Sequence, residues 1–189
     1  MASTRERILQ TTCSLLETQG YHATGLNQIL IKSCTPKGSL YYYFPKGKEE
    51  LAAEAIRSTS QTIVEHIECQ LAVSPDPVEA IRLFIQHIAQ YIELSGFQAG
   101  GPLMIVALET VNSSEPLNAA CREAYQLLQA AFARKLISSG YSLEKATSLA
   151  EFTVASIEGG TILSRIQHSS APLHRISEEL GVLLRAATE

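Results

Sequence analysis

The stretch RERILQTTCSLLETQGYHATGLNQILIKSCTPKGSLYYYFPKGKEEL, residues 5–51, decides the fold. Ile8 and Leu15 stand seven residues apart within a run whose apolar side chains recur at the spacing of one helical face. Gly20 then ends the helix, because glycine readily adopts the left-handed conformation that often follows a helix C terminus. The sequence therefore predicts a first helix over about residues 4–19.

Two shorter helices are expected next. Thr24 is a suitable N-cap for a helix of about two turns, and Thr35 with Pro36 forms the N-cap and first-position pair of another. The third helix starts at residue 36 and stops near Phe44-Pro45. The joint between the two short helices is three residues, 33–35, which is the spacing of a helix-turn-helix.

In a helix-turn-helix the second helix enters the major groove of DNA with its N-terminal side chains on bases and phosphates. Here that helix has a cation at Lys37, a small residue at Gly38, a short hydroxyl at Ser39 and then three tyrosines. Leu40 and Phe44 lie four residues apart and should face the interior. The alternative is an amphipathic surface helix with an aromatic cluster and no nucleic-acid partner.

The rest of the chain also has helical periodicity. Asp76 and Pro77 supply a carboxylate cap and a first-position proline, Gly140 ends a helix, and Ser142 can cap the next one. No stretch alternates long enough to be a strand, so the sequence predicts an all-α fold of about nine helices. After the first three, the expected helices cover about residues 48–71, 77–92, 103–111, 116–138, 142–167 and 172–187.

Composition limits the class of protein. Hydrophobic residues make up 46% and charged residues 18%, which is typical of globular chains. The net charge is −4, but residues 1–50 hold six Lys or Arg against four acids, so the N-terminal segment is the plausible nucleic-acid face. The four cysteines lack metal or disulfide spacing, so we expect no metal and no cofactor. Without a membrane-length apolar run or a signal sequence, we expect a cytoplasmic protein.

Residues 5–51 resemble the DNA-binding domain of the TetR family of repressors. The features that carry the resemblance are Gly20-Tyr21 after the first helix, Ala23-Thr24 at the second, Lys37 to Tyr41 in the third, and Phe44 followed by Lys48-Glu49-Glu50-Leu51. The resemblance implies a helix-turn-helix domain over residues 1–47 and a ligand-binding and dimerisation domain over residues 48–189.

By the same resemblance, Thr24 and Lys48 are expected phosphate contacts at helix N termini, where free N–H groups also favour anions. The full set of expected DNA-binding residues is Thr24, Thr35, Pro36, Lys37, Gly38, Ser39, Tyr41, Tyr42, Tyr43, Lys46 and Lys48.

Two features depart from the common family pattern. Cys34 occupies a turn position where the family usually has glycine, and a positive φ is costly for a residue with a Cβ. The linker FPKGKEEL is one residue longer than the usual form, as in a branch of the family that includes the LmrA and YxaF repressors. The longer linker leaves open whether Lys46 or Lys48 takes the phosphate.

The later part of the chain is similar to the same branch, which implies a homodimer formed by the last two long helices, about 142–167 and 172–187. Expected interface residues are Ile157, Gly159, Gly160, Leu163, Ile176, Leu180 and Leu183. The alternative is that these residues bury against their own subunit.

The family architecture also implies a mostly apolar ligand cavity. The expected effector is a small planar aromatic or drug-like compound that releases a palindromic operator. The candidate wall residues, each of which can equally be plain core, are Ile63, His66, Ile67, Phe84, His87, Tyr91, Met104, Leu108, Tyr125, Phe152 and Ser156.

An enzyme and a helical adaptor are the two alternatives to a regulator. An enzyme is disfavoured, since the chain has no G-x-S-x-G, no H-E-x-x-H and no phosphate-binding glycine loop. A helical adaptor that no longer binds DNA draws support only from Cys34 and from the modest N-terminal charge.

Overall fold

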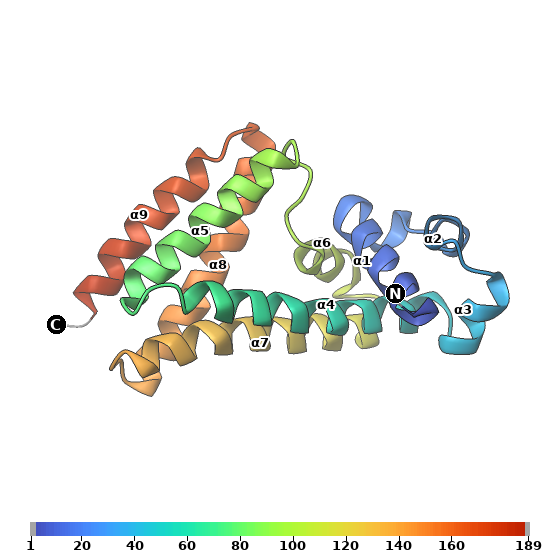
Figure 1. The fold of residues 1–189 in the computed structure, drawn as a ribbon, viewed down its shortest axis with the longest axis horizontal. Coiled ribbons are helices and arrows are strands. Elements are labelled where there is room, and N and C mark those ends of the chain that lie inside the picture. The colour runs from blue at the N-terminus through green and yellow to red at the C-terminus, as the bar shows by residue number, and fades with distance from the viewer. Residues whose placement is uncertain (1–2, 188–189) are drawn as a thin grey trace. The chain divides into compact units, whose positions relative to one another are not determined.

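The computed structural model describes residues 3–187, and within them it contains helices and no strand (Figure 1). The prediction of an all-α fold with about nine helices is confirmed. The helices are α1 (Thr4–Ala23), α2 (Leu26–Ser33), α3 (Lys37–Tyr43), α4 (Lys48–Leu71), α5 (Pro77–Leu94), α6 (Pro102–Thr110), α7 (Glu115–Ser138), α8 (Leu143–Gln167) and α9 (Ala171–Ala186).

The chain forms two compact units. The first comprises Met1–Thr62 with Gly101–Tyr125, and the second comprises Ile63–Gly100 with Gln126–Glu189. Helices α4 and α7 each contribute residues to both units. The first unit extends beyond the expected helix-turn-helix segment 1–47, because α6 packs against α1.

The first unit has a small apolar core under its short helices. Ile8 and Leu15 of α1, Ile29 of α2, Leu40 of α3 and Phe44 are all buried. Removing these side chains from water stabilises α2 and α3, which have eight and seven residues and are too short to be stable alone. The core therefore fixes α2 and α3 on α1.

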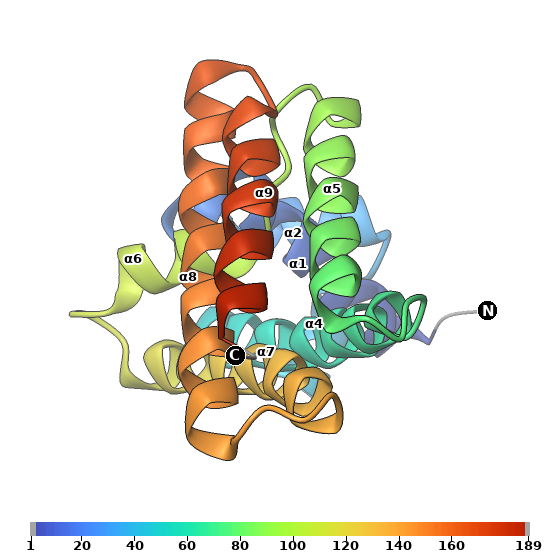
Figure 2. The same ribbon diagram turned by 90° about the vertical axis from the view of Figure 1, so that its left-hand side faces the viewer.

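In the second unit, α5, α8 and α9 lie side by side (Figure 2). Gly160 of α8 permits a close approach to α9, since a Cβ there would lie 2.6 Å from Cδ1 of Ile176. The predicted caps are confirmed: Asp76 accepts a hydrogen bond from Val78 N–H at the start of α5, and Ser142 accepts one from Lys145 N–H in α8.

None of the helices within residues 3–187 combines the length and the apolar character that a membrane crossing requires.

Candidate nucleic-acid interface

The turn between α2 and α3 is a regular helix C-cap. Cys34 has φ 51° and ψ 46°, the left-handed conformation that glycine usually supplies. Its N–H bonds to the carbonyl of Ile31 at 3.2 Å, and the N–H of Thr35 bonds to that of Leu30 at 3.1 Å. These bonds satisfy carbonyls at the end of α2. Cys34 thus adopts a positive φ in spite of its Cβ, and the turn stays regular.

Helix α3 presents a polar and aromatic surface. Leu40 on its inner face is buried, whereas Lys37 and Gly38 are exposed. Tyr42 is 79% exposed and Tyr41 is 46% exposed. Hydroxyls and a cation on rigid exposed stems suit contacts with base edges and phosphates better than they suit a folded core.

A surface hollow of about 350 Å³ lies between α2 and α3. Its lining residues are Gly25, Leu26, Asn27, Leu30, Lys37, Leu40 and Tyr41.

This hollow combines two features that favour an anion. One wall is the first turn of α2, where the N-cap Gly25 makes no side-chain cap, and the opposite wall carries the Lys37 side chain. Backbone N–H groups at a helix start and a nearby ammonium both favour phosphate. Sequence analysis missed Asn27, although its place in the first turn of α2 was the available signal.

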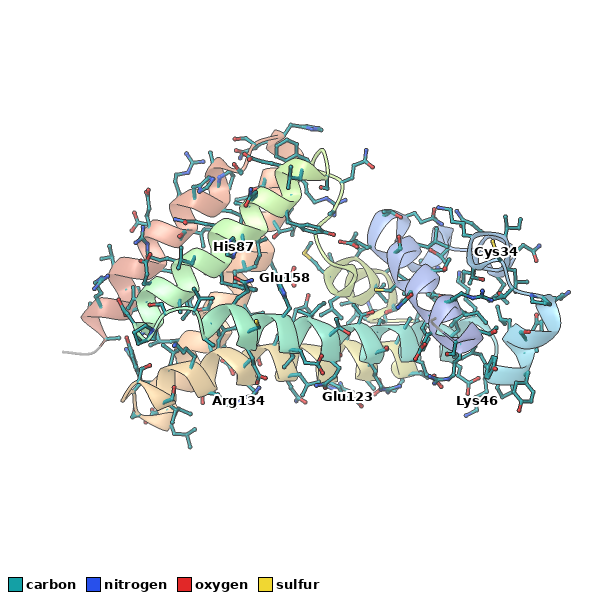
Figure 3. The ribbon with its side chains drawn as sticks, viewed as in Figure 1. Cys34, Lys46, His87, Glu123, Arg134 and Glu158 are labelled. Carbon is teal, nitrogen blue, oxygen red and sulfur yellow. The ribbon has the colours of Figure 1, made fainter. Side chains whose placement is uncertain are left out.

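The structure separates the two candidate linker lysines. The Lys48 ammonium lies 4.2 Å from the centre of the Tyr21 ring, and the side chain is half-buried. Burial lowers the pKa of Lys48, while the negative charge of Glu109 opposes that shift. Lys46 is exposed at the turn before α4 (Figure 3). Lys46 therefore has the more accessible ammonium of the two, and the phosphate contact of either lysine stays a prediction.

Thr24 and Thr35 also require correction. Thr24 is buried and donates its hydroxyl to the Gly20 carbonyl at 2.6 Å, and the N-cap of α2 is Gly25 instead. Thr35 is buried with its hydroxyl 2.6 Å from that of Ser33, and α3 has no side-chain cap. These hydroxyls are used inside the fold, so neither is available to a phosphate.

The remaining expected DNA-binding residues stay at the surface of the helix-turn-helix. Pro36 is exposed at the N-cap of α3, and Ser39 is half-buried in its first turn. Tyr43 is half-buried, with its ring 4.9 Å from that of Tyr42 in an edge-to-face contact. Tyr42 is thus the most accessible of the three tyrosines, and Tyr43 supports its ring.

The candidate effector residues divide between the two compact units. Met104, Leu108 and Tyr125 belong to the first unit, and the other eight belong to the second. Ile67 and Phe84 are buried, and the Phe84 ring makes an edge-to-face contact with Phe132. In the second unit the exposed candidates are His66, His87, Tyr91 and Phe152, and the half-buried ones are Ile63 and Ser156. In the first unit Leu108 is exposed, and Met104 and Tyr125 are half-buried.

The expected dimer residues fall into two groups. Gly160 and Leu180 are buried between α8 and α9 of the same chain, as in the alternative considered from the sequence. Leu163 and Leu183 are exposed, and Ile157, Gly159 and Ile176 are half-buried.

The outward face of α8 carries apolar residues beyond those expected at the dimer interface. Phe152, Gly159, Leu163 and Ile166 follow one another at steps of seven, four and three, so they share a face. Phe152, Leu163 and Ile166 are all large and exposed. We call these four residues the α8 stripe. Phe152, expected in a ligand cavity, belongs to this face.

A helix-turn-helix with a cationic and aromatic outer helix defines a DNA-binding regulator. Comparison with known proteins agrees. Residues 8–55 match the family described as bacterial regulatory proteins, tetR family, and residues 77–179 match the C-terminal domain of LmrA/YxaF-like transcriptional regulators.

Individual relatives match over nearly the whole chain. The HTH-type transcriptional regulator YxaF of Bacillus subtilis (strain 168) is 46% identical over 182 residues, covering 96% of this chain and 95% of that protein. The regulator LmrA of the same organism is 39% identical over 181 residues, covering 96% of each. The crystal structure of regulatory protein TetR from Rhodobacter sphaeroides has a TM-score of 0.82 at 21% identity, covering 95% of this chain and 98% of that one.

The chain belongs to the TetR family of transcriptional regulators and carries an LmrA/YxaF-like C-terminal domain. Its function is transcriptional regulation through a helix-turn-helix, and it is not an enzyme.

Proposed function

We propose that this regulator is a cytoplasmic repressor that binds a palindromic operator as a homodimer and leaves it when a small aromatic or drug-like effector binds. The observation that carries the proposal is the outer surface of the helix-turn-helix. There Lys37, Tyr41 and Tyr42 are exposed above a buried Leu40, beside a hollow that suits a phosphate.

The DNA contacts divide by chemistry. A backbone phosphate would occupy the hollow, between the first-turn N–H groups of α2 and the Lys37 ammonium, with Lys46 on a neighbouring phosphate. Ser39 and Tyr42 would reach base edges, because they stand near the start and on the outer face of α3. Phosphate contacts fix the position of the protein on DNA, and base contacts select the sequence.

The homodimer is supported by the α8 stripe. Exposed contiguous apolar surface on a soluble chain marks an interaction site, and α9 adds the exposed Val182 and Leu183. A second copy of this chain presents the same apolar surface, so a two-fold contact buries both at once. Two recognition helices then address half-sites about one DNA turn, roughly 34 to 36 Å, apart.

For the effector, we propose a site on the second unit that uses exposed Tyr91 of α5 with His87 on the same helix. An exposed tyrosine and an imidazole offer stacking surface and hydrogen bonds to a planar compound. The compound releases DNA only if it binds more tightly to a conformation that does not match the operator. A coupling of about 1 to 3 kcal/mol, or roughly 5- to 150-fold in operator affinity, is typical.

Selection from a random DNA library tests the repressor proposal. The protein should enrich an inverted repeat and scatter light as a particle of about twice the 20.6 kDa chain mass. A screen of aromatic compounds should then yield ligands that raise the melting temperature and lower affinity for that repeat. Failure to enrich any sequence would favour the adaptor alternative, and ligands that stabilise the protein without changing operator affinity would contradict induction.

A further inference from the structure

The last turn of α6 is joined to the end of α1 by one carboxylate. Glu109 accepts hydrogen bonds at Oε2 from the backbone N–H of Tyr21 at 2.6 Å and of His22 at 3.1 Å. The His22 imidazole Nε2 lies 3.3 Å from the Glu109 carbonyl oxygen. All three residues belong to the first compact unit.

The carboxylate is needed because α1 is interrupted at Gly20. That residue has φ 78° and ψ −177°, so the N–H groups that follow it no longer point along a regular helix. The Glu109 oxygen satisfies two of them, the part-buried N–H of Tyr21 and the exposed N–H of His22. The positive φ at residue 20 favours glycine, and a Cβ there would also displace the Glu109 carboxylate.

In a further hydrogen bond between these segments, the acceptor lies on α1 and the donor at the start of α6. Glu17 of α1 accepts a bond at Oε1 from the N–H of Gly101, the N-cap of α6, at 3.2 Å. The Lys48 ammonium, which lies over the Tyr21 ring, adds a favourable charge near Glu109. Helix α6 is thus held by α1 at both ends, with a carboxylate at each.

The segment that Glu109 holds leads directly into the DNA-binding helices. Tyr21 to Ala23 precede Thr24 and Gly25, and α2 starts at the next residue. Gln19 and Gln28 add a pair of reciprocal amide hydrogen bonds, of 2.7 and 3.1 Å, between α1 and α2. Besides the apolar core, the backbone at Tyr21 and His22 therefore contributes to the orientation of α2 and α3 relative to α1.

We propose that Glu109 is a positioning residue for DNA binding, which holds the α1–α2 connection in its DNA-competent form. The inference rests on the DNA interface proposed above. The helix-turn-helix is joined to α4 by the continuous chain, and Glu109 connects it to α6 as well.

The test uses the full-length protein and the DNA repeat that the parent selects from the random library. Glu109→Ala removes both acceptors, and Glu109→Gln keeps one uncharged acceptor oxygen. Glu115→Ala is the matched control, because Glu115 is an exposed acid nearby in the chain that pairs with Arg122 on its own helix.

We expect Glu109→Ala to weaken DNA binding about tenfold, which corresponds to about 1.4 kcal/mol, with Glu109→Gln between it and the parent. The salt slope should not change, because no phosphate contact is lost. Loss of a few kcal/mol of stability leaves nearly all of a typical protein folded, so a tenfold effect would report the native orientation of the helices. The control should stay within twofold.

Amide hydrogen exchange supplies the second readout. Exchange at Tyr21 and His22 should accelerate in Glu109→Ala while that of Leu40 on α3 stays unchanged. Parent-like DNA affinity in Glu109→Ala, an equal loss in Glu115→Ala, or unprotected Tyr21 and His22 amides in the parent would each overturn the role of Glu109. If the parent itself selects no DNA, the proposed DNA interface fails, and this inference fails with it.

Discussion

The outer faces of α3 and α8 expose large side chains to a similar degree but differ in what surrounds them. On α3 the exposed rings of Tyr41 and Tyr42 carry hydroxyls and stand beside the ammonium of Lys37. In the α8 stripe the exposed side chains, such as Leu163 and Ile166, carry no polar atoms. Exposure alone therefore does not identify a partner. Polar aromatics with a cation favour phosphates and bases, whereas a purely apolar stripe favours another protein surface.

Among the substitutions considered, a charge placed in the α8 stripe should have the largest effect on dimerisation and DNA binding. Leu163→Glu places a charge in the centre of the α8 stripe, where a partner copy would have to desolvate it. We expect a monomer of 20.6 kDa by light scattering at micromolar concentration, and at least a hundredfold loss of operator affinity.

The matched control is Leu143→Glu, an exposed leucine at the start of the same helix and outside the stripe. This variant should remain dimeric with parent-like DNA binding. If Leu163→Glu also remains dimeric, the comparison between the two faces is wrong for α8.

The next effect belongs to the polar face. Lys37→Ala and Lys46→Ala should each weaken DNA binding about tenfold on all sequences and reduce the salt slope by about one, as expected for one lost phosphate contact. Lys48→Ala should change the slope less, since its ammonium is half-buried over Tyr21. Titrations across a range of salt concentrations measure all three, with Lys145→Ala of α8 as the exposed control. A full unit lost in Lys48→Ala alone would reverse the assignment.

Two adjacent glycines of α8 distinguish packing within the chain from packing against a partner copy. Gly160→Ala would bring a Cβ within 2.6 Å of Ile176 and 2.8 Å of Leu173, and such overpacking typically costs about 1 to 3 kcal/mol. Gly159→Ala meets no atom within 4 Å and should be neutral or stabilise by up to about 1 kcal/mol through helix propensity. Thermal unfolding measures both. A large loss in Gly159→Ala would show that the partner copy packs closely on that residue.

The last effect concerns the pH dependence of stability and depends on a buried thiol. Burial raises the pKa of Cys121 from 9.0 to about 11. A raised pKa in the folded state contributes stability that is present below pH 9 and is lost as the pH rises towards 11, about 2 to 3 kcal/mol for this shift. Denaturant unfolding between pH 8 and 11 measures the loss, which Cys121→Ala should reduce.

Thiol labelling tests the burial of Cys121 independently. At pH 8, Cys34 and Cys69 should react, because both are exposed, while Cys121 should react only after unfolding. Rapid labelling of Cys121 in the folded protein would contradict its burial.

Local signals decided which parts of the structure were predictable from sequence. The caps Asp76 and Ser142, each bonding an N–H two or three residues on, were predicted correctly. Thr24 and Thr35 could also cap a helix, but their hydroxyls bond to residues that precede them, Thr24 to the Gly20 carbonyl and Thr35 to the Ser33 hydroxyl. Propensity rules identify residues able to cap, and the fold determines which of them do.

The candidate site divides in the same way. Lys37, Gly38 and the three tyrosines lie on α3 as the motif implied, because the turn and the helix are encoded within ten residues. The bonds from Tyr21 and His22 to Glu109 join segments more than 80 residues apart and leave no periodic or spacing signal. The contact of the Lys48 ammonium with the Tyr21 ring likewise joins residues of two different helices and leaves no spacing signal.

The contact between Gly20 and Glu109 also limits how regulators of this kind can be recombined. A chimera that takes its helix-turn-helix from one family member and its remaining helices from another would join a new residue 20 to an old residue 109. A side chain at residue 20 would be strained by the positive φ and would displace the Glu109 carboxylate, and a shorter residue at 109 would remove the acceptor of the Tyr21 and His22 amides. A chimera built on this chain should therefore move α6 together with α1.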